Sequence, residues 1–330
     1  MASFTKHAYR YALMSALLIL LGGCGGGGSS NDGGSSLPAD LPNYVGTWVA
    51  SCSSDWPTYV FTLSINASGQ YFLISNEYDS AANCGNDANI LNTSIDSATV
   101  TSIEANASNA AYSDIYVAVS ETRKTAHAAS EVSGWISAEY CGKSDWSAGT
   151  EATFNASNPG TGASSTCYQS SSRPAALLSG STLSINGRGG FDGADPADVV
   201  YSKQSSMPLL SGVINGTPWV MISGKARPGF DAGSLFYTLY DTYVPDICNT
   251  FYISSRYTVL FSLPDASGEY ALGLGGYSVT LYDGTSNYIV TSGSNTLQSV
   301  TSNEVNGNTS ATYDSNYSVS GQYTVARCSS

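Results

Sequence analysis

The sequence is poor in charged residues, and basic residues are the scarcest. Only 11% of the 330 residues are charged, and 25 acidic residues outnumber 12 basic ones, so the net charge is −13. The shortage of basic residues argues against binding of nucleic acid, which needs a basic footprint to neutralise phosphates. It also argues against a polybasic surface that would hold anionic lipids. Any contact with a membrane must therefore come from another feature of the chain.

That feature lies near the start of the sequence. Lys6 and Arg10 precede a ten-residue apolar run from Ala12 to Leu21, which is too short to span a bilayer as a helix. The run ends in Leu21-Gly22-Gly23-Cys24, which resembles the lipobox of bacterial lipoproteins. The resemblance implies cleavage of a signal peptide (residues 1–23) and attachment of lipid to Cys24. Because two or more acyl chains hold a protein stably, we expect a lipid anchor in the cell envelope.

A flexible tether is expected between this anchor and the folded part. Residues 24–41 are rich in Gly and Ser and contain almost nothing apolar, so they cannot bury a core. Gly25, rather than an Asp, follows Cys24. By resemblance to the sorting of Gram-negative lipoproteins, this favours the outer membrane, with the periplasmic and the surface-facing orientation both open. The signal peptide carries two of the 12 basic residues and no acidic residue, so the mature chain would have a net charge of −15.

The rest of the composition predicts an all-β protein. The chain has 23 Tyr and 34 Gly and is rich in Ser, Thr and Asn, residues that suit half-wet sheet surfaces and turns. Short alternating segments such as Tyr59–Ile65 are separated by turn residues, as in β-sandwiches and β-barrels. Asn215-Gly216 between apolar arms predicts a type I′ hairpin, with Pro218 on an edge strand. One helix is expected within residues 120–130.

We predict two antiparallel β-barrel or β-sandwich domains, residues 42–205 and 208–330, stabilised by disulfides. Six cysteines remain after Cys24, an even number that indicates three disulfides in an oxidising compartment. The domain division pairs Cys248 with Cys328. It leaves three arrangements for the first four cysteines, of which the sequence-adjacent one is preferred: Cys52 with Cys84, and Cys141 with Cys167.

The first domain opens with Gly46-Thr47-Trp48, and Cys52 follows closely. This opening resembles the Gly-x-Trp start of lipocalin-like barrels, and the strand at Leu183-Ser184-Ile185 and the later strand containing Tyr201 resemble their ending. The resemblance implies a small barrel with room for one ligand. We expect it to bind a small apolar ligand, in contact with Trp48 and Trp135. The second domain resembles uncharacterised β-domains of bacterial lipoproteins, which imply no activity.

Catalysis has little support, and we expect neither catalytic residues nor a metal or other cofactor. His127 is the one histidine of the mature chain, and its small, polar neighbours favour a solvated surface position. No Cys-x-x-Cys or Gly-x-Ser-x-Gly pattern occurs. A hydrolase remains as the weakest alternative. It would need His127 or an acid pair, and the acid candidates are Glu121, Glu131, Glu139 and Glu151.

Two further alternatives concern ligands at the surface. Calcium ligands are offered by two groups of residues that do not fit a twelve-residue calcium loop: Asp192, Asp195 and Asp198, and separately Asn83, Asn86, Asp87 and Asn89. A glycan- or protein-binding surface could be built from exposed aromatic rings, with Trp56, Trp135, Trp146, Trp219 and several Tyr as candidates.

Overall fold

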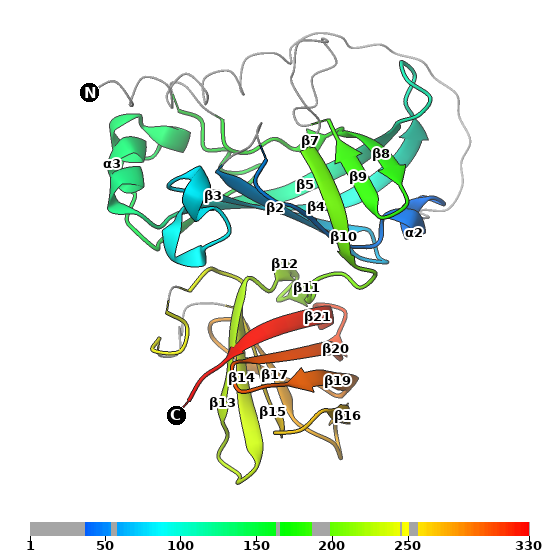
Figure 1. Ribbon diagram of the computed structural model, residues 1–330, viewed down its shortest axis with the longest axis vertical. Coiled ribbons are helices and arrows are strands. Elements are labelled where there is room, and N and C mark those ends of the chain that lie inside the picture. Colours follow the sequence, from blue (N-terminus) through cyan, green and yellow to red (C-terminus); the bar gives the residue numbers. More distant parts are fainter. Residues whose placement is uncertain are drawn as a thin grey trace. The chain divides into compact units, whose positions relative to one another are not determined.

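The structure is a computed structural model that describes residues 37–53, 58–162, 166–186, 199–244, 246–250 and 257–329. The predicted signal peptide and most of the predicted tether lie outside these residues. Strands make up 57% of the structure and helices 8%, in two barrel-like sheets, one closed and one nearly closed. The all-β prediction is therefore confirmed (Figure 1). No helix among the described residues is long and apolar enough to cross a membrane.

The first barrel is a closed antiparallel barrel of eight strands. Its strands are β1 (Gly46–Ala50), β2 (Tyr59–Ile65), β3 (Gln70–Tyr78), β4 (Ile90–Ala105), β5 (Ser113–Ala126), β8 (Ala175–Ser179), β9 (Thr182–Ile185) and β10 (Val199–Ser205). Each of these strands pairs with the next, and β10 returns to pair with β1. Two short strands, β6 (Glu151–Phe154) and β7 (Ser171–Ser172), pair with β5 outside this ring. The first barrel thus has a simple up-and-down topology.

The closure between β1 and β10 depends on Gly46. Its φ is +137°, and a Cβ atom at this position would lie 2.5 Å from the carbonyl oxygen of Ser205. Only glycine permits such a close approach of two backbones. The register between the two strands shifts between Thr47 and Trp48, which bends β1 at the point where the barrel closes.

The helices of this part of the chain are short. They are α2 (Leu41–Tyr44), α3 (Ala129–Ser137) and the 3₁₀-helices η1 (Ala81–Asn83), η2 (Asp87–Asn89) and η3 (Tyr140–Gly142). The helix predicted within residues 120–130 is wrong, because β5 continues to Ala126 and α3 begins only at Ala129. Thr122 to Thr125 pair with β6, and this tertiary pairing outweighs the local helix propensity.

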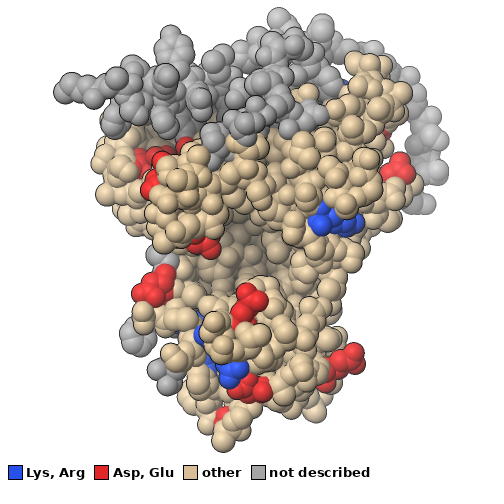
Figure 2. Space-filling model, in the orientation of Figure 1, with Lys and Arg blue, Asp and Glu red and all other residues tan. Residues whose placement is uncertain are grey.

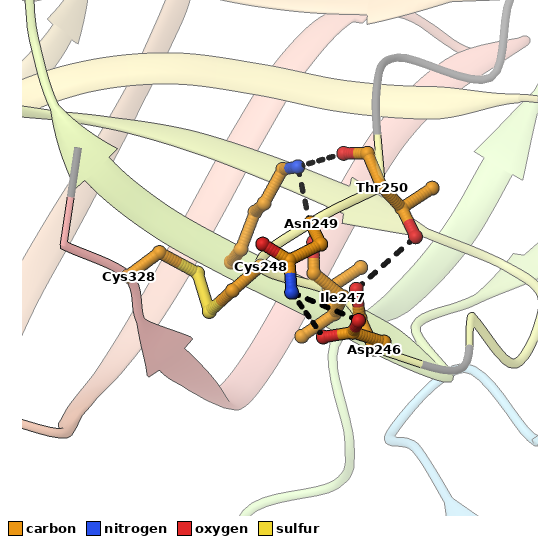
Figure 3. Close-up of a disulfide and its surroundings, with 7 residues drawn as sticks. Asp246, Ile247, Cys248, Asn249, Thr250 and Cys328 are labelled. Carbon is orange, nitrogen blue, oxygen red and sulfur yellow. Dashed lines mark hydrogen bonds between the residues drawn. A yellow bond between two sulfur atoms is a disulfide. The ribbon is translucent and has the colours of Figure 1, made fainter.

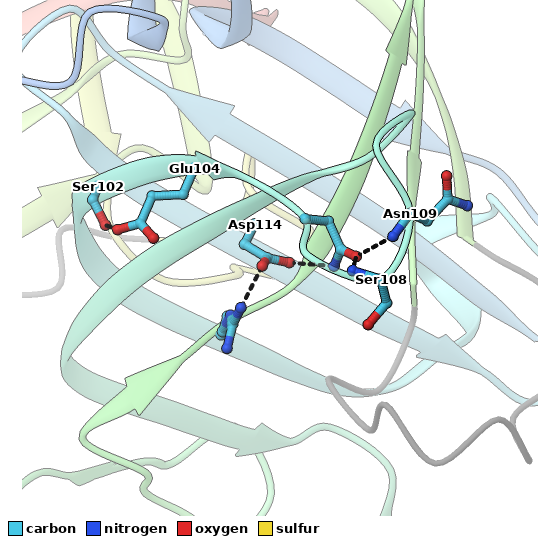
Figure 4. Close-up of polar contacts among 7 residues, drawn as sticks. Ser102, Glu104, Ser108, Asn109 and Asp114 are labelled. Carbon is cyan, nitrogen blue, oxygen red and sulfur yellow. Dashed lines mark hydrogen bonds and ion pairs between the residues drawn. The ribbon is translucent and has the colours of Figure 1, made fainter. Parts of the chain in front are cut away.

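A buried carboxylate fixes the hairpin between β4 and β5 (Figure 4). Asp114 is fully buried and accepts hydrogen bonds from Asn106 Nδ2 at 2.7 Å and from Arg173 at 2.5 Å. The Asn106 side-chain oxygen in turn accepts the N–H groups of Ser108 at 2.9 Å and Asn109 at 2.8 Å. Hydrogen bonds therefore link the turn to the buried carboxylate of Asp114, and the charge of this carboxylate is paired with Arg173.

The second sheet forms the nearly closed barrel. Its strands are β11 (Ser211–Ile214), β12 (Thr217–Val220), β13 (Ser223–Pro228), β14 (Ser234–Tyr240), β15 (Thr258–Pro264), β16 (Gly268–Gly273), β17 (Val279–Tyr282), β18 (Asn287–Ile289), β19 (Ser292–Val300), β20 (Glu304–Asp314) and β21 (Tyr317–Arg327). The order along the sheet is β16-β19-β20-β21-β13-β14-β15-β17-β18, and β11 joins β12 to β21. One continuous cluster of buried side chains, with Trp219, Tyr237 and Phe261 among the largest, forms its core.

The predicted hairpin at Asn215-Gly216 is confirmed. Asn215 and Gly216 have φ values of +55° and +72°, as a type I′ turn requires, and connect β11 to β12. Pro218 lies on β12, which pairs with β11 alone among the described strands. Its missing N–H group therefore breaks no hydrogen-bond ladder, as predicted for an edge strand.

The structure contains the three predicted disulfides: Cys52–Cys84, Cys141–Cys167 and Cys248–Cys328. Cys248 lies in a segment whose backbone is held by a buried lysine (Figure 3). Lys225 Nζ donates hydrogen bonds to the carbonyl oxygens of Ile247, at 3.1 Å, and of Thr250. Figure 2 shows one face of the molecule, on which uncharged surface predominates and acidic groups are more frequent than basic ones.

Candidate functional site

The best candidate for a site is the lumen of the first barrel, and the alternation along β4 shows which side chains enter it. Thr99 and Thr101 are exposed, whereas Ala98 and Val100 are buried at 6% and 2%. Since successive side chains of a strand point to opposite faces, Ala98 and Val100 face the lumen. The alternation reverses before them, because Ile95 and Ser97 are buried at 2% and 0% and Asp96 is half-buried. Asp96 therefore lies on the face of β4 opposite to Ile95 and Ser97.

Two tyrosines of the first barrel, Tyr71 and Tyr201, are buried at 6% and 3%. Burial raises the pKa of Tyr71 above its ordinary value, and the nearby charge of Asp96 raises it further. Burial likewise raises the pKa of Tyr201, with an added electrostatic contribution from Tyr71. Tyr71 lies on β3 and Tyr201 on β10, which are not neighbours in the sheet. Their side chains can therefore interact only across the lumen.

Polar contacts connect β4 and β5 at the same level. Thr122 Oγ1 donates a hydrogen bond to Asp96 Oδ1 at 2.6 Å, and Lys124 Nζ donates one to Ser94 Oγ at 3.1 Å. Burial raises the pKa of the Asp96 carboxyl group, although the charge of Lys124 and the hydrogen bond from Thr122 act in the opposite direction. We call Ser94, Asp96, Thr122 and Lys124 the β4–β5 polar cluster.

Apolar side chains line the lumen. Val100, Ile115 and Val117 on β4 and β5 are buried at 2%, 1% and 3%, and Leu183 and Ile185 on β9 at 0% and 7%. The lumen of the first barrel therefore has an apolar wall.

The two tryptophans that the sequence analysis expected at a ligand are both buried. Trp48 is fully buried, and Lys203 Nζ lies 4.8 Å from the centre of its ring. Trp135 is 7% exposed and lies on α3, where it packs against Tyr140 and Trp146 with ring centres 4.7 and 4.6 Å apart. Trp48 lies on β1 and Trp135 on α3, and Trp135 belongs to a core cluster with Trp146 and Phe154.

The aromatic cluster on α3 adjoins the β4–β5 polar cluster. Ala126, at the end of β5, belongs to the same group of buried residues as Trp135, Trp146 and Phe154. Lys124 Nζ lies 5.8 Å from the centre of the Tyr140 ring, within the range of a cation–π interaction. Lys124 thus lies between the polar side chains of β4 and the rings beside α3.

His127 is half-buried, so the prediction of a solvated position is not met. It follows β5 directly, and the fold holds it close to the buried end of this strand. Burial lowers its pKa to about 4. The imidazole is therefore neutral at physiological pH.

Two of the predicted acid candidates come together, but around a cation. Arg123, 4% exposed, lies 3.3 Å from a carboxylate oxygen of Glu121 and 3.7 Å from one of Glu151. The guanidinium group of Arg123 forms an ion pair with both carboxylates. These residues serve to fasten β6 to β5.

The calcium candidates that the structure describes have local roles. Asn86 Oδ1 accepts the N–H of Ala88 at the start of η2, and Asn83 Nδ2 donates to Asp79 Oδ1 at 2.9 Å. Asp192, Asp195 and Asp198 lie outside the described residues. Among the described residues, no group of three or more His, Cys, Asp or Glu side chains could hold a metal ion.

The row of exposed tryptophans expected for glycan binding is not present among the described residues. Trp48, Trp135, Trp146 and Trp219 are all buried, and Trp56 lies outside the described residues. Exposed apolar side chains occur instead on loops and strands of the second sheet. They are Phe230 (95% exposed), Leu274 (86%), Ile289 (57%), Tyr313 (41%) and Tyr277 (40%).

An open depression on the second sheet is the other feature that could receive a ligand. Its lining consists of Pro228, Val300, Thr301, Ser302, Arg327, Cys328 and Ser329. Arg327, the charged residue of this lining, already donates to Asp265 at 2.5 Å and to the carbonyl oxygen of Thr301 at 2.9 Å. Its charge is therefore engaged in holding the surface together.

The sequence analysis missed the β4–β5 polar cluster. Its one visible signal was a charged residue, Asp96, among the small residues of β4. Comparison with known proteins adds no assignment: no family model matches the chain, and no curated protein is significantly similar to it.

Proposed function

We propose that the chain is a lipid-anchored protein of the bacterial cell envelope whose first barrel binds a small ligand without catalysis. The closed up-and-down barrel of eight strands is the observation that carries this proposal. Barrels of this size can hold one small ligand. The apolar wall formed by Val100, Ile115 and Val117 supports a ligand with an apolar part, as the lipocalin-like opening at Gly46-Thr47-Trp48 led us to expect.

Native mass spectrometry of residues 41–330, exported without lipid, tests this proposal. We expect a reproducible added mass that is lost on denaturation. The first variant is Ala98→Phe, which fills the lumen from β4 and should abolish the added mass. Thr99→Phe places the same ring on the outer face of the same strand and should retain it. Equal retention by both folded variants would show that the ligand does not lie in the lumen.

The lipid anchor is tested separately at Cys24. The variant Cys24→Ser removes the thiol that would accept the diacylglyceryl group, so it should abolish metabolic labelling by fatty acid and release of the mature form. Membrane fractionation should then place the wild-type protein, with Gly25 after the anchor, in the outer membrane. Lipid labelling that survives the substitution would contradict the anchor.

A second candidate function is a glycan- or protein-binding surface on the second sheet. It is favoured by the exposed side chains of Phe230, Leu274 and Ile289, because exposed apolar groups frequently mark interaction sites. Binding of the protein to purified envelope glycans can be measured by equilibrium dialysis. Binding that falls on substitution of Leu274 and Ile289 by Ser would support this function, and the absence of any binding would remove the glycan version.

A further inference from the structure

Three hairpin turns of the second sheet meet around one tyrosine hydroxyl group. The turn after β11 contains Asn215, the turn after β17 begins with Asp283, and the turn after β20 leads into Tyr317. The hydroxyl oxygen of Tyr317 lies 3.1 Å from Asn215 Oδ1 and 3.2 Å from Asp283 Oδ2. Asn316 belongs to the same group, because its carbonyl oxygen accepts the N–H of Gly216 at 3.1 Å. Residues that are far apart in the sequence thus present their polar groups together.

Tyrosine rings pack beside these polar groups. Tyr317 is 6% exposed and belongs to the core of the second sheet. The Tyr288 ring stacks on it, with ring centres 3.7 Å apart and an angle of 24° between the planes. Tyr313 packs edge-on against both rings, at 5.5 Å from Tyr288 and 6.1 Å from Tyr317, and is 41% exposed. The core therefore holds an aromatic group that reaches the surface at Tyr313. We call the following residues the three-turn site: Asn215, Asp283, Tyr288, Tyr313, Asn316 and Tyr317.

The polar groups of the three-turn site have unused hydrogen-bonding capacity. One hydroxyl proton cannot be donated to two acceptors at once, so Tyr317 serves either Asn215 Oδ1 or Asp283 Oδ2 at any moment. Among the described residues, neither of these two oxygen atoms accepts another hydrogen bond, and the side-chain amide groups of Asn215 and Asn316 donate none. Both asparagines are exposed, so a ligand can reach these groups.

Charge at the three-turn site favours an uncharged ligand. Asp283 Oδ1 accepts the N–H groups of Thr285 at 2.9 Å and Ser286 at 2.7 Å. Burial acts to raise the pKa of Asp283, but these hydrogen bonds outweigh it and lower the pKa to about 2, so the group remains a carboxylate. Its charge is thus already stabilised within its own turn, and a cationic ligand gains little from it. An anionic ligand would meet this carboxylate and that of Asp314, which lies in the turn after β20.

We propose that the three-turn site binds an uncharged hexopyranose unit of a glycan, with the apolar face of the sugar ring on Tyr313 and its hydroxyl groups hydrogen-bonded to the amide and carboxylate groups of the site. This inference rests on the second candidate function and names its ligand class and its site. The C–H groups of a pyranose ring carry partial positive charge and the face of an aromatic ring is negative, so the two attract each other. Sugar hydroxyl groups both donate and accept hydrogen bonds, as the unused amide groups and the shared tyrosine proton require.

NMR titration with monosaccharides tests the ligand class. The probes are the methyl pyranosides of glucose, galactose, mannose and N-acetylglucosamine, and the protein is the whole two-barrel chain carrying Cys24→Ser, which needs no detergent. We expect at least one of the four pyranosides to bind. For each one that binds, the 2-amino sugar and the uronic acid of the same configuration test the effect of charge. Both charged sugars should bind more weakly than the uncharged one.

Two substitutions then locate the site. Tyr313→Ala removes the exposed ring and should weaken binding of the pyranoside about twofold to tenfold. Asn316→Ala removes an amide group from an exposed turn and should weaken binding by a similar factor. The matched control is Tyr277→Ala, because Tyr277 is 40% exposed, like Tyr313, but lies between β16 and β17, outside the three turns. This control should leave the affinity unchanged. All three side chains are exposed, so the substitutions leave the core of the sheet intact.

The outcomes separate this inference from the second candidate function. Unchanged affinity in both Tyr313→Ala and Asn316→Ala, an equal loss in Tyr277→Ala, or tighter binding of a charged sugar would overturn the inference but leave a glycan-binding surface standing. If none of the four pyranosides binds, the inference is wrong, and equilibrium dialysis with envelope glycans then decides whether the second candidate function survives.

Discussion

The disulfide between Cys248 and Cys328 should contribute more to stability than either disulfide of the first barrel. It joins residues 80 positions apart, compared with 32 for Cys52–Cys84 and 26 for Cys141–Cys167. A disulfide stabilises mainly by restricting the unfolded chain, and the restriction grows with the logarithm of the loop length. The chain-entropy relation gives about 4.5 kcal/mol for Cys248–Cys328 and about 3.6 kcal/mol for each of the other two.

The assay is denaturant unfolding of variants in which both cysteines of a pair are replaced by Ala. Trp219 is fully buried in the second sheet, and its indole N–H donates to the carbonyl oxygen of Tyr257 at 3.1 Å, so its fluorescence reports on this sheet. We expect the Cys248/Cys328 double variant to lower the free energy of unfolding by about 4 kcal/mol. A free energy of unfolding can be assigned to one sheet only if the two sheets unfold in separate transitions, and scanning calorimetry checks this.

The matched comparison is the Cys52/Cys84 double variant. The entropy argument requires its loss to be smaller, by about 1 kcal/mol. Lys225, which holds the backbone at Ile247 and Thr250, still links this segment to β13 when the disulfide is absent. Native contacts therefore persist, and the effect should lie in the unfolded state. A loss at Cys248/Cys328 below about 1 kcal/mol, or below that at Cys52/Cys84, would refute the reasoning.

Three further predictions concern single residues. Asp114→Ala leaves the buried amide of Asn106 without its acceptor and should lower the free energy of unfolding by about 1–3 kcal/mol, measured by thermal and chemical denaturation. His127 has a pKa of about 4 when folded and about 6.5 when unfolded, so the unfolded state takes up the proton first as pH falls. Stability should therefore decrease from pH 6.5 to 4 and level off below, and His127→Gln should remove this slope; an NMR titration midpoint near 6.5 would contradict it. Gly216→Ala should lower stability by about 1 kcal/mol through its φ of +72° alone, because a Cβ atom there would meet no steric clash and its nearest neighbour, Asn316 Oδ1, lies 4.0 Å away. The same substitution at Gly134, in α3 and at an ordinary φ, should have no such penalty.

The sequence predicted those features that depend on a few neighbouring residues. The hairpin at Asn215-Gly216 follows from two residues that tolerate positive φ, and the strand Tyr59–Ile65 from apolar alternation. The three disulfides followed from an even cysteine count, from the domain division for Cys248–Cys328, and from proximity in the sequence for the other two. None of these signals requires the closure of the sheet.

Features that depend on the closed sheet escaped prediction. β4 extends over sixteen residues, Ile90–Ala105, but few of them are large and apolar. Its burial alternation reverses between Ser97 and Ala98, so the contrast between inner and outer face that marks a strand in a sequence is weak there. The helix wrongly expected within residues 120–130 has a related cause. The pairing of β5 with β6 is a contact between distant segments, which local propensity cannot anticipate.

The β4–β5 polar cluster shows most clearly why a group of contacts can be invisible in the sequence. Along β4, Ile95 and Ser97 are buried on one phase of the alternation, and Ala98 and Val100 are buried on the other. One extra residue, as in a β-bulge, changes the phase in this way. Thr122 and Lys124, on the neighbouring strand, contact Asp96 and Ser94 across 26 and 30 positions of the sequence. No short window of the sequence contains both partners, so neither the change of phase nor these contacts could be read from local periodicity.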